Sequence, residues 1–204
     1  GSEMCIRDRA TTAAPRKTAK PSAKAAAKSV APPVAAKAVL TITSKNYSSW
    51  SLRGWLMARF AGLDFDERVL PPDDPANRAD LLLLSSSIRV PDLRVGDVHV
   101  WDTLAIGEYL HENFPKAGLL PTDPKARAHC RAICGEMHSG FASLRSALPM
   151  NLRAHFPKFK VWSRAQADID RITTIWRECI DAHGGPFLFG KQPTPVSYTH
   201  LTLP

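Results

Sequence analysis

Short runs of β-forming residues flank one helical run in the first patterned stretch of the chain. The segments AVLTIT (38–43) and FDERVL (65–70) are each typical of a short strand. Between them, polar SKNYSS precedes apolar residues with helical spacing at Leu52, Leu56 and Phe60. The pattern predicts a strand, a helix and a second strand.

A hairpin and a second helix are expected downstream. The long connection before the hairpin contains one expected helical turn, near residues 81–84. VPDLRV and VHVW are separated by a Gly-Asp pair at 96–97, which predicts a tight turn. The next run, DTLAIGEYLHENF, predicts a helix capped near Asp102 or Thr103 and stopped by Pro115. Strand, helix, strand, hairpin and helix is the order of a thioredoxin-like domain, which we place at 38–115.

The rest of the chain has only helical periodicity, which predicts an all-α domain at 122–195. One long helix is expected to start near Pro124, and another after Pro157. The apolar stripe of the first is Cys130, Ile133, Cys134, Met137, Phe141, Leu144 and Leu148; that of the second is Ile169, Ile172, Trp176, Cys179 and Ile180.

The two ends of the chain share an unusual relation at the level of DNA. Residues 1–9, GSEMCIRDR, can be encoded by a sequence ending AGATGTGTATAAGAGAC, and VSYTHL, from Val196, by its reverse complement. We interpret segments 1–9 and 196–204 as translated sequencing-library adapter. The native coding sequence is then expected to run from about Ala10 to about Pro195, truncated before the last helices of the core.

Composition separates a tail from the patterned part. Residues 10–37 are rich in Ala, Lys and Pro and contain no acidic or aromatic residue, so we expect them to be disordered. The tail carries six of the chain's eight net positive charges, and the adapter-like ends cancel. The remaining core is close to neutral, which argues against a nucleic-acid partner for it.

Cysteine usage and hydropathy indicate a reducing, aqueous location. Outside the ends there are three cysteines, an odd number without a disulfide-framework spacing, and no run is long enough to span a membrane. We expect a cytoplasmic protein. Cys130, Cys134 and His138 have the i, i+4, i+8 spacing of a possible metal site, but they lie on the apolar stripe, so core packing and no metal are predicted.

Three stretches, in order, resemble signatures of the glutathione S-transferase family: YSSWSLRGW (47–55), RVPDL (89–93) and WDTLAIGEYL (101–110). The first is similar to the serine-rich signature of the zeta-like, maleylacetoacetate isomerase-like branch. The helical half is similar mainly in its LLP linker and in MHSGFASLRSALPMNLR (137–153). The resemblance implies a thioredoxin-like glutathione-binding domain followed by an all-helical domain.

Four hydroxyls in the first signature are candidates for chemistry: Tyr47, Ser48, Ser49 and Ser51. Serines at a helix start usually cap it. The resemblance implies that Ser48 faces the glutathione sulfur, with Tyr47 as the alternative. Ser49 is expected to support the first helical turn and to belong to the glutathione-binding residues. Where that branch has a cysteine this chain has Trp50, which argues against exchange through a mixed disulfide.

The other signatures imply the remaining glutathione contacts. The backbone of Val90, before Pro91, would pair with the cysteinyl part; an ordinary proline opening a strand is the alternative. Asp102 and Thr103 would hold the γ-glutamyl group, although an N-cap alone also explains them. The resemblance also places four residues at the border of the electrophile pocket: Tyr47, Met137, Phe141 and Arg145. Packing within the helical core is the alternative for the last three.

These observations predict a glutathione transferase acting on a small electrophile, homodimeric in its full-length form. Two alternatives stay open. One is a non-catalytic interaction module with the same fold, and the other is a glutathione-dependent cis-trans isomerase.

Overall fold

The computed structural model describes residues 37–70 and 90–199. The first elements are β1 (Ala38–Ile42), α1 (Ser49–Phe60), β2 (Phe65–Val69), β3 (Asp92–Val95), β4 (Val98–Trp101) and α3 (Thr103–Asn113). A short 3-10 helix, η1 (Pro115–Ala117), precedes α4 (Pro124–Ser139), α5 (Ala142–Ala147), α6 (Ser163–His183) and α7 (Pro195–Thr199). The helical turn expected at 81–84 and segment 1–9 lie outside the described residues, as does all of the 10–37 tail except Lys37.

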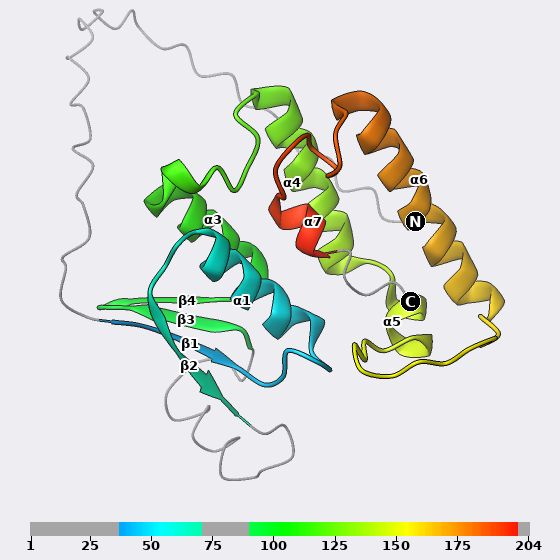
Figure 1. Cartoon of the computed structure of the whole chain (residues 1–204), viewed down its shortest axis with the longest axis horizontal. Coiled ribbons are helices and arrows are strands. Elements are labelled where there is room, and N and C mark those ends of the chain that lie inside the picture. Colours follow the sequence, from blue (N-terminus) through cyan, green and yellow to red (C-terminus); the bar gives the residue numbers. More distant parts are fainter. Residues whose placement is uncertain (1–36, 71–89, 200–204) are drawn as a thin grey trace, which may run out of the picture. The chain divides into compact units, whose positions relative to one another are not determined.

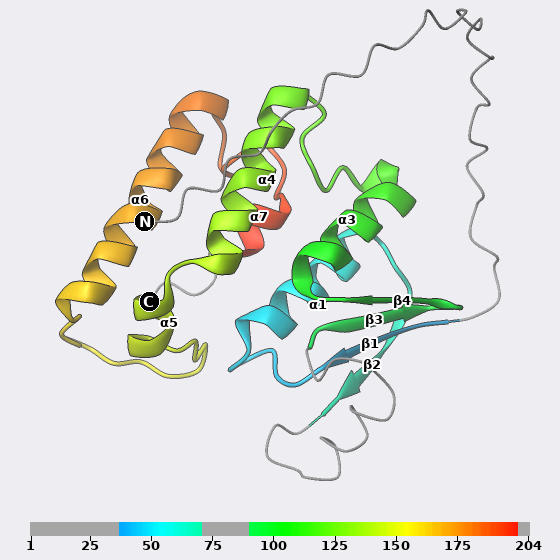
Figure 2. The same cartoon turned by 180° about the vertical axis from the view of Figure 1, so that it is seen from behind.

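The strands form one mixed sheet in the order β2-β1-β3-β4. β1 pairs parallel with β2 and antiparallel with β3, and β3 pairs antiparallel with β4. Helices α1 and α3 pack together over one face of this sheet (Figures 1 and 2). The predicted thioredoxin-like arrangement is confirmed.

An apolar layer between the sheet and its two helices forms the first core. Leu40 and Leu93 pair across β1 and β3, and both are fully buried. Ile106 and Leu110 meet them from α3, and Met57 from α1. This burial fixes the face that each strand turns toward the helices.

Helices α4 to α7 enclose a second core, which confirms the predicted all-helical part. Cys130, Cys134 and Cys179 are free thiols buried in it, as predicted. Val196, in the adapter-like segment, is also fully buried there as part of α7.

The expected continuous helix from Pro124 to Leu148 is wrong. α4 ends at Ser139, Gly140 is extended, and Phe141 adopts a left-handed conformation with φ 62°. The chain then restarts as α5. Phe141 and Leu144 are nevertheless buried in the second core. The apolar spacing therefore predicted their burial correctly, although the helix is interrupted.

The predicted stripe of α6 is wrong at one position. Ile180 is exposed, whereas Ile175, outside the predicted stripe, is buried with Ile172 and Cys179. Neighbours on a helix point about 100° apart, so Cys179 and Ile180 do not both face the same core.

Gly54, in the middle of α1, lies against Pro91. A Cβ atom at this position would lie 2.7 Å from the Cβ and Cγ atoms of Pro91. We expect Gly54→Ala to lower the free energy of unfolding by about 1–3 kcal/mol, because a rigid ring and a helix backbone must separate. Urea unfolding monitored by circular dichroism measures this.

Gly135→Ala is the matched control, since no atom lies within 4 Å of its added Cβ in α4. It should leave stability unchanged or raise it by about 0.5–1 kcal/mol through helix propensity. Equal effects of the two substitutions would contradict the Gly54 contact.

Candidate functional site

Three segments far apart in sequence end at one edge of the sheet. In the register, Asp92 pairs with Thr41 on one side and with Trp101 on the other. The end of β1, the start of β3 and the end of β4 are therefore adjacent. The residues that follow β1, precede β3 and follow β4 include the predicted Ser48, Val90 and Asp102.

Ser48 is the N-cap of α1. Its Oγ accepts a hydrogen bond from the backbone N–H of Ser51 at 3.3 Å, and its backbone is extended. The cap uses one acceptor site of the hydroxyl and leaves its O–H as a donor. Capping and a role toward a ligand are thus compatible in the same side chain.

The neighbouring hydroxyls differ in environment. Ser51 is fully buried, and its Oγ accepts from the backbone N–H of Thr43 at 3.2 Å. Tyr47 is 67% exposed. Ser49 is the half-buried first residue of α1. Of the four, Ser48 combines the helix start with an O–H that the cap leaves available.

Val90 and Pro91 lie at the entrance to β3. The peptide bond between them is cis, an isomer that the sequence alone left open. Pro91 is buried, and the β1–β3 pairing begins at Asp92, so Val90 precedes the ladder. Its backbone stands at the edge where a ligand strand could add.

The start of α3 is the third part of the edge. Asp102, the N-cap, has φ 59° and ψ 163°, a region that residues other than glycine seldom occupy. Its Oδ1 accepts from the backbone N–H groups of Leu104 at 2.8 Å and Ala105 at 3.3 Å. Thr103 is buried, and its Oγ1 has no hydrogen-bond partner within the described part of the chain.

Trp50 is surrounded by nitrogen-bearing side chains. The Cζ atoms of Arg53 and Arg145 lie 4.4 and 4.7 Å from its ring centroid, and the His138 ring meets it edge-on at 5.0 Å. Burial lowers the pKa of Arg53, and the nearby Arg145 lowers it further. Burial also lowers the pKa of Arg145. The group joins α1 to α4 and α5 beside the candidate site.

The predicted pocket residues are placed differently from one another. Met137 and Phe141 are buried in the second core, whereas Arg145 reaches Trp50 and donates to the carbonyl oxygen of Met137 at 2.5 Å. His138, to which the sequence assigned only core packing, is partly exposed and contacts Asp102 and Trp50. No sequence signal distinguished it from the other residues on its stripe.

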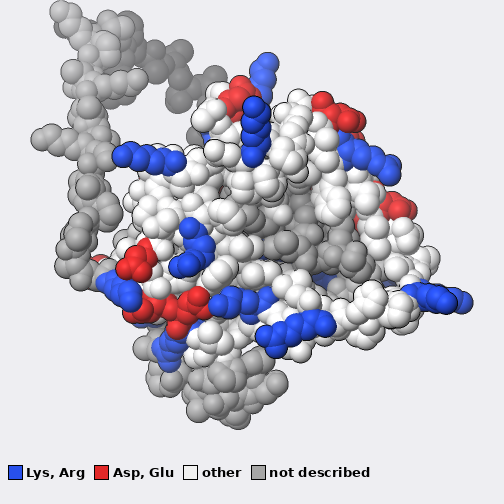
Figure 3. Space-filling model, viewed as in Figure 1, with Lys and Arg blue, Asp and Glu red and all other residues white. Residues whose placement is uncertain are grey.

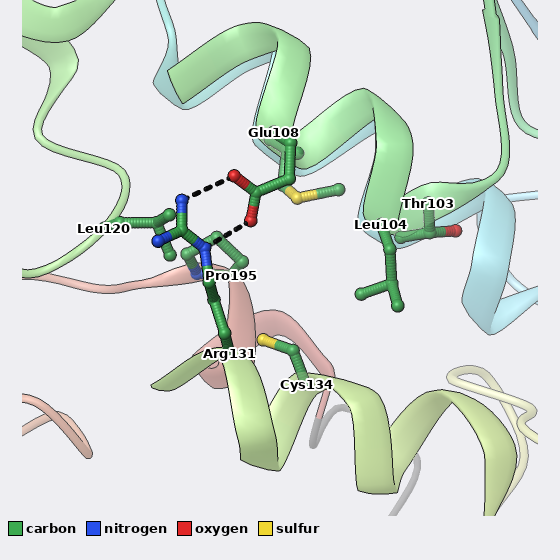
Figure 4. A pocket seen from close by; sticks show the side chains of 9 residues that line it. Thr103, Leu104, Glu108, Leu120, Arg131, Cys134 and Pro195 are labelled. Atoms are coloured by element: carbon green, nitrogen blue, oxygen red, sulfur yellow. Dashed lines mark hydrogen bonds and ion pairs between the residues drawn. The ribbon is translucent and has the colours of Figure 1, made fainter. Parts of the chain in front are cut away.

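A cavity of about 240 Å³ lies between α1, α3, α4 and α7. Glu108 from α3 and Arg131 from α4 form a two-point ion pair on its wall (Figure 4). Cys134 also lines it, and a hydrogen bond to Cys130, together with burial, raises the pKa of the Cys134 thiol far above its ordinary value. The raised pKa disfavours the Cys134 thiolate, and Thr103 of the candidate site also lines this cavity.

Charges on the surface are mixed. On the face shown in Figure 3, basic and acidic side chains lie interspersed. Within residues 37–70 and 90–199, no group of three or more His, Cys, Asp or Glu residues is arranged to hold a metal ion. No helix in those ranges combines the length and apolar character needed to cross a membrane.

Comparison with known proteins agrees with this geometry. Residues 47–113 match the family model described as glutathione S-transferase, N-terminal domain. This stretch of the chain is thus similar to a glutathione S-transferase N-terminal domain. Maleylacetoacetate isomerase of Rattus norvegicus is 29% identical to it over 115 residues, which is 55% of this chain and 52% of that protein. The chain spans about half the length of the curated relatives it matches.

Solved structures extend the similarity of fold beyond the glutathione S-transferase domain. A glutathione transferase homolog from Burkholderia, solved with bound glutathione, is 21% identical with a TM-score of 0.59, covering 80% of this chain and 77% of that one. Maleylacetoacetate isomerase from Anaeromyxobacter dehalogenans is 24% identical with a TM-score of 0.55, covering 80% and 72%. The helical half thus belongs to the same two-part fold.

The buried hydroxyl of Ser51 is expected to have a structural role, because it accepts a hydrogen bond from the backbone of β1's neighbour Thr43. We expect Ser51→Ala to cost about 1–3 kcal/mol of stability, because the Thr43 N–H loses its acceptor in a buried place. Ser49→Ala, two residues earlier and at a half-buried position, should change stability by less than about 0.5 kcal/mol. Thermal unfolding of both variants checks this; a neutral Ser51→Ala would contradict the assignment.

Proposed function

We propose that this protein is a glutathione transferase in which the Ser48 hydroxyl stabilises the glutathione thiolate. The observation that carries the proposal is the position of Ser48. It caps the 12-residue helix α1 with an acceptor site, keeps its O–H as a donor, and lies beside two further edge segments suited to a peptide ligand.

The proposed seating of glutathione uses all three segments. The sulfur lies at Ser48 and the N-terminus of α1, and the cysteinyl backbone pairs with Val90. The γ-glutamyl end lies at Asp102 and Thr103, where the partnerless Thr103 Oγ1 supports the fit because a ligand carboxylate would accept its hydrogen bond. The glutathione bound to the Burkholderia homolog supports the same ligand class.

The energetic requirement is modest. A free thiol has a pKa of about 8.5, so only a few per cent is thiolate at neutral pH. Lowering this pKa by about two units requires about 2.7 kcal/mol of preferential thiolate stabilisation. A charge-assisted hydrogen bond contributes roughly 1.5–3 kcal/mol and a helix N-terminus roughly 0.3–1 kcal/mol, so together they suffice.

The resulting thiolate would attack an electrophilic carbon and form a carbon–sulfur bond, while a leaving group departs or a proton is taken up at the neighbouring carbon. The signature helix has Trp50 and no cysteine, so the protein itself supplies no thiol for disulfide exchange there. The transferase is expected in the cytoplasm and as a homodimer.

A second candidate is a glutathione-dependent cis-trans isomerase. The names of the curated relatives favour it, and the chemistry is close. The same thiolate would add to an activated double bond, permit rotation about the resulting single bond, and leave again. A non-catalytic module, the third possibility, would bind glutathione without lowering its thiol pKa.

The test is to titrate the ultraviolet absorbance of the glutathione thiolate in the complex. We expect the bound thiol to titrate about two pH units below free glutathione. Since the folded complex stabilises the ionised thiol, glutathione should also bind more tightly as pH rises through that lowered pKa. Ser48→Ala should raise the bound thiol pKa by about one unit or more, through loss of the donor.

Ser48→Gly is the matched control for capping, because glycine at an N-cap costs only a few tenths of a kcal/mol relative to serine and has no side-chain donor. It should keep nearly wild-type stability and still show the raised thiol pKa. If Ser48→Ala forms thiolate at the wild-type pKa, the role of Ser48 is wrong. If wild-type protein binds glutathione without lowering its thiol pKa, the non-catalytic module is correct.

A further inference from the structure

His138 contacts two parts of the candidate site from the opposite half of the molecule. It lies in the last turn of α4, and its Nε2 is 3.3 Å from Asp102 Oδ2. Its ring also meets the Trp50 ring edge-on, with an interplanar angle of 67° and centroids 5.0 Å apart. A single side chain therefore links the starts of α1 and α3.

The two oxygens of Asp102 have separate tasks. Oδ1 is occupied by the backbone N–H groups of Leu104 and Ala105, which leaves Oδ2 for His138. The backbone of Asp102 is in a sparsely populated region, and such a conformation persists only where surrounding contacts hold it. The His138 contact is one that comes from outside the residue's own helix.

We propose that His138 is a positioning residue for glutathione. Its Nε2 lies 3.3 Å from Asp102 Oδ2 and holds the carboxylate that faces the γ-glutamyl group, while its ring packs against Trp50 near the start of α1. The inference rests on the proposed function. In the proposed seating the sulfur lies at Ser48, whereas His138 acts through Asp102, so it is expected to alter binding rather than the thiol pKa.

The surrounding charges fit a donor at this place. Arg53 and Arg145 approach the Trp50 ring, and Asp102 is the carboxylate that lies within 3.3 Å of the imidazole. The contact needs an N–H at Nε2, which both the neutral and the charged imidazole can carry. An uncharged amide of similar reach should therefore replace it.

The experiment measures glutathione affinity by isothermal titration calorimetry on the full chain. We expect His138→Ala to bind glutathione about tenfold more weakly, because the Asp102 carboxylate loses a close polar partner that holds it in place. His138→Gln should remain within about threefold of wild type, because its amide can donate to Asp102. The bound thiol pKa should be unchanged in both variants.

His129→Ala is the matched control. His129 is an exposed histidine of the same helix, and its ring contacts are to His183 and Phe189 within the helical half. It should bind glutathione as wild type does. In an Asp102→Ala background, His138→Ala should cause no further loss, because its effect passes through Asp102.

The possible results distinguish failure of the His138 role from failure of the proposed function. Three results would each overturn the positioning role and leave the proposed function standing. His138→Ala could bind glutathione as wild type does, or His138→Gln could lose as much affinity as His138→Ala. The third is that the losses from His138→Ala and Asp102→Ala add. Absence of glutathione binding by the wild-type chain would overturn the proposed function and the positioning role together.

Discussion

The register of β3 is the constraint on which the site depends. Leu93 pairs with Leu40 on one side and Val100 on the other, and burial of this apolar row selects one register out of the alternatives. A slip by one residue would turn Leu93 away from α1 and α3. Because the register holds, Asp92 lies between Thr41 and Trp101, and the segments that carry Ser48, Val90 and Asp102 meet at one edge. Core packing therefore sets the geometry of the proposed chemistry.

The N-termini of α1 and α3 form the second part of the candidate site. α1 and α3 both start at this edge, so backbone N–H groups and the positive ends of two helix dipoles face the same place. That arrangement suits an anionic tripeptide whose central cysteine sulfur lies at the start of α1 and whose γ-glutamyl carboxylate lies at the start of α3. The helical half contributes through Trp50, which Arg53, Arg145 and His138 surround. Trp50 thus connects α1 to α4 and α5. The related branch has a cysteine at the position of Trp50.

Local patterns predicted most of the fold but not its exceptions. Alternation, helical spacing and the Gly-Asp turn were enough for the sheet and its helices. The break at Gly140 was missed because Phe141 and Leu144 keep helical spacing across it, and Ile180 was misplaced because periodicity does not show which core a helix faces. Ser48 became a candidate because a motif marks it. His138 did not become one, since its contact with Asp102 joins residues 36 positions apart, which only the tertiary structure brings together.

In the proposed complex, one edge of the sheet holds glutathione with its sulfur at Ser48. A crystal structure of the protein soaked with glutathione would show whether it does. We expect the sulfur within hydrogen-bond distance of Ser48 Oγ, the cysteinyl backbone paired with Val90, and the γ-glutamyl carboxylate at Thr103 Oγ1. Glutathione bound elsewhere, or with its sulfur directed away from the start of α1, would contradict it.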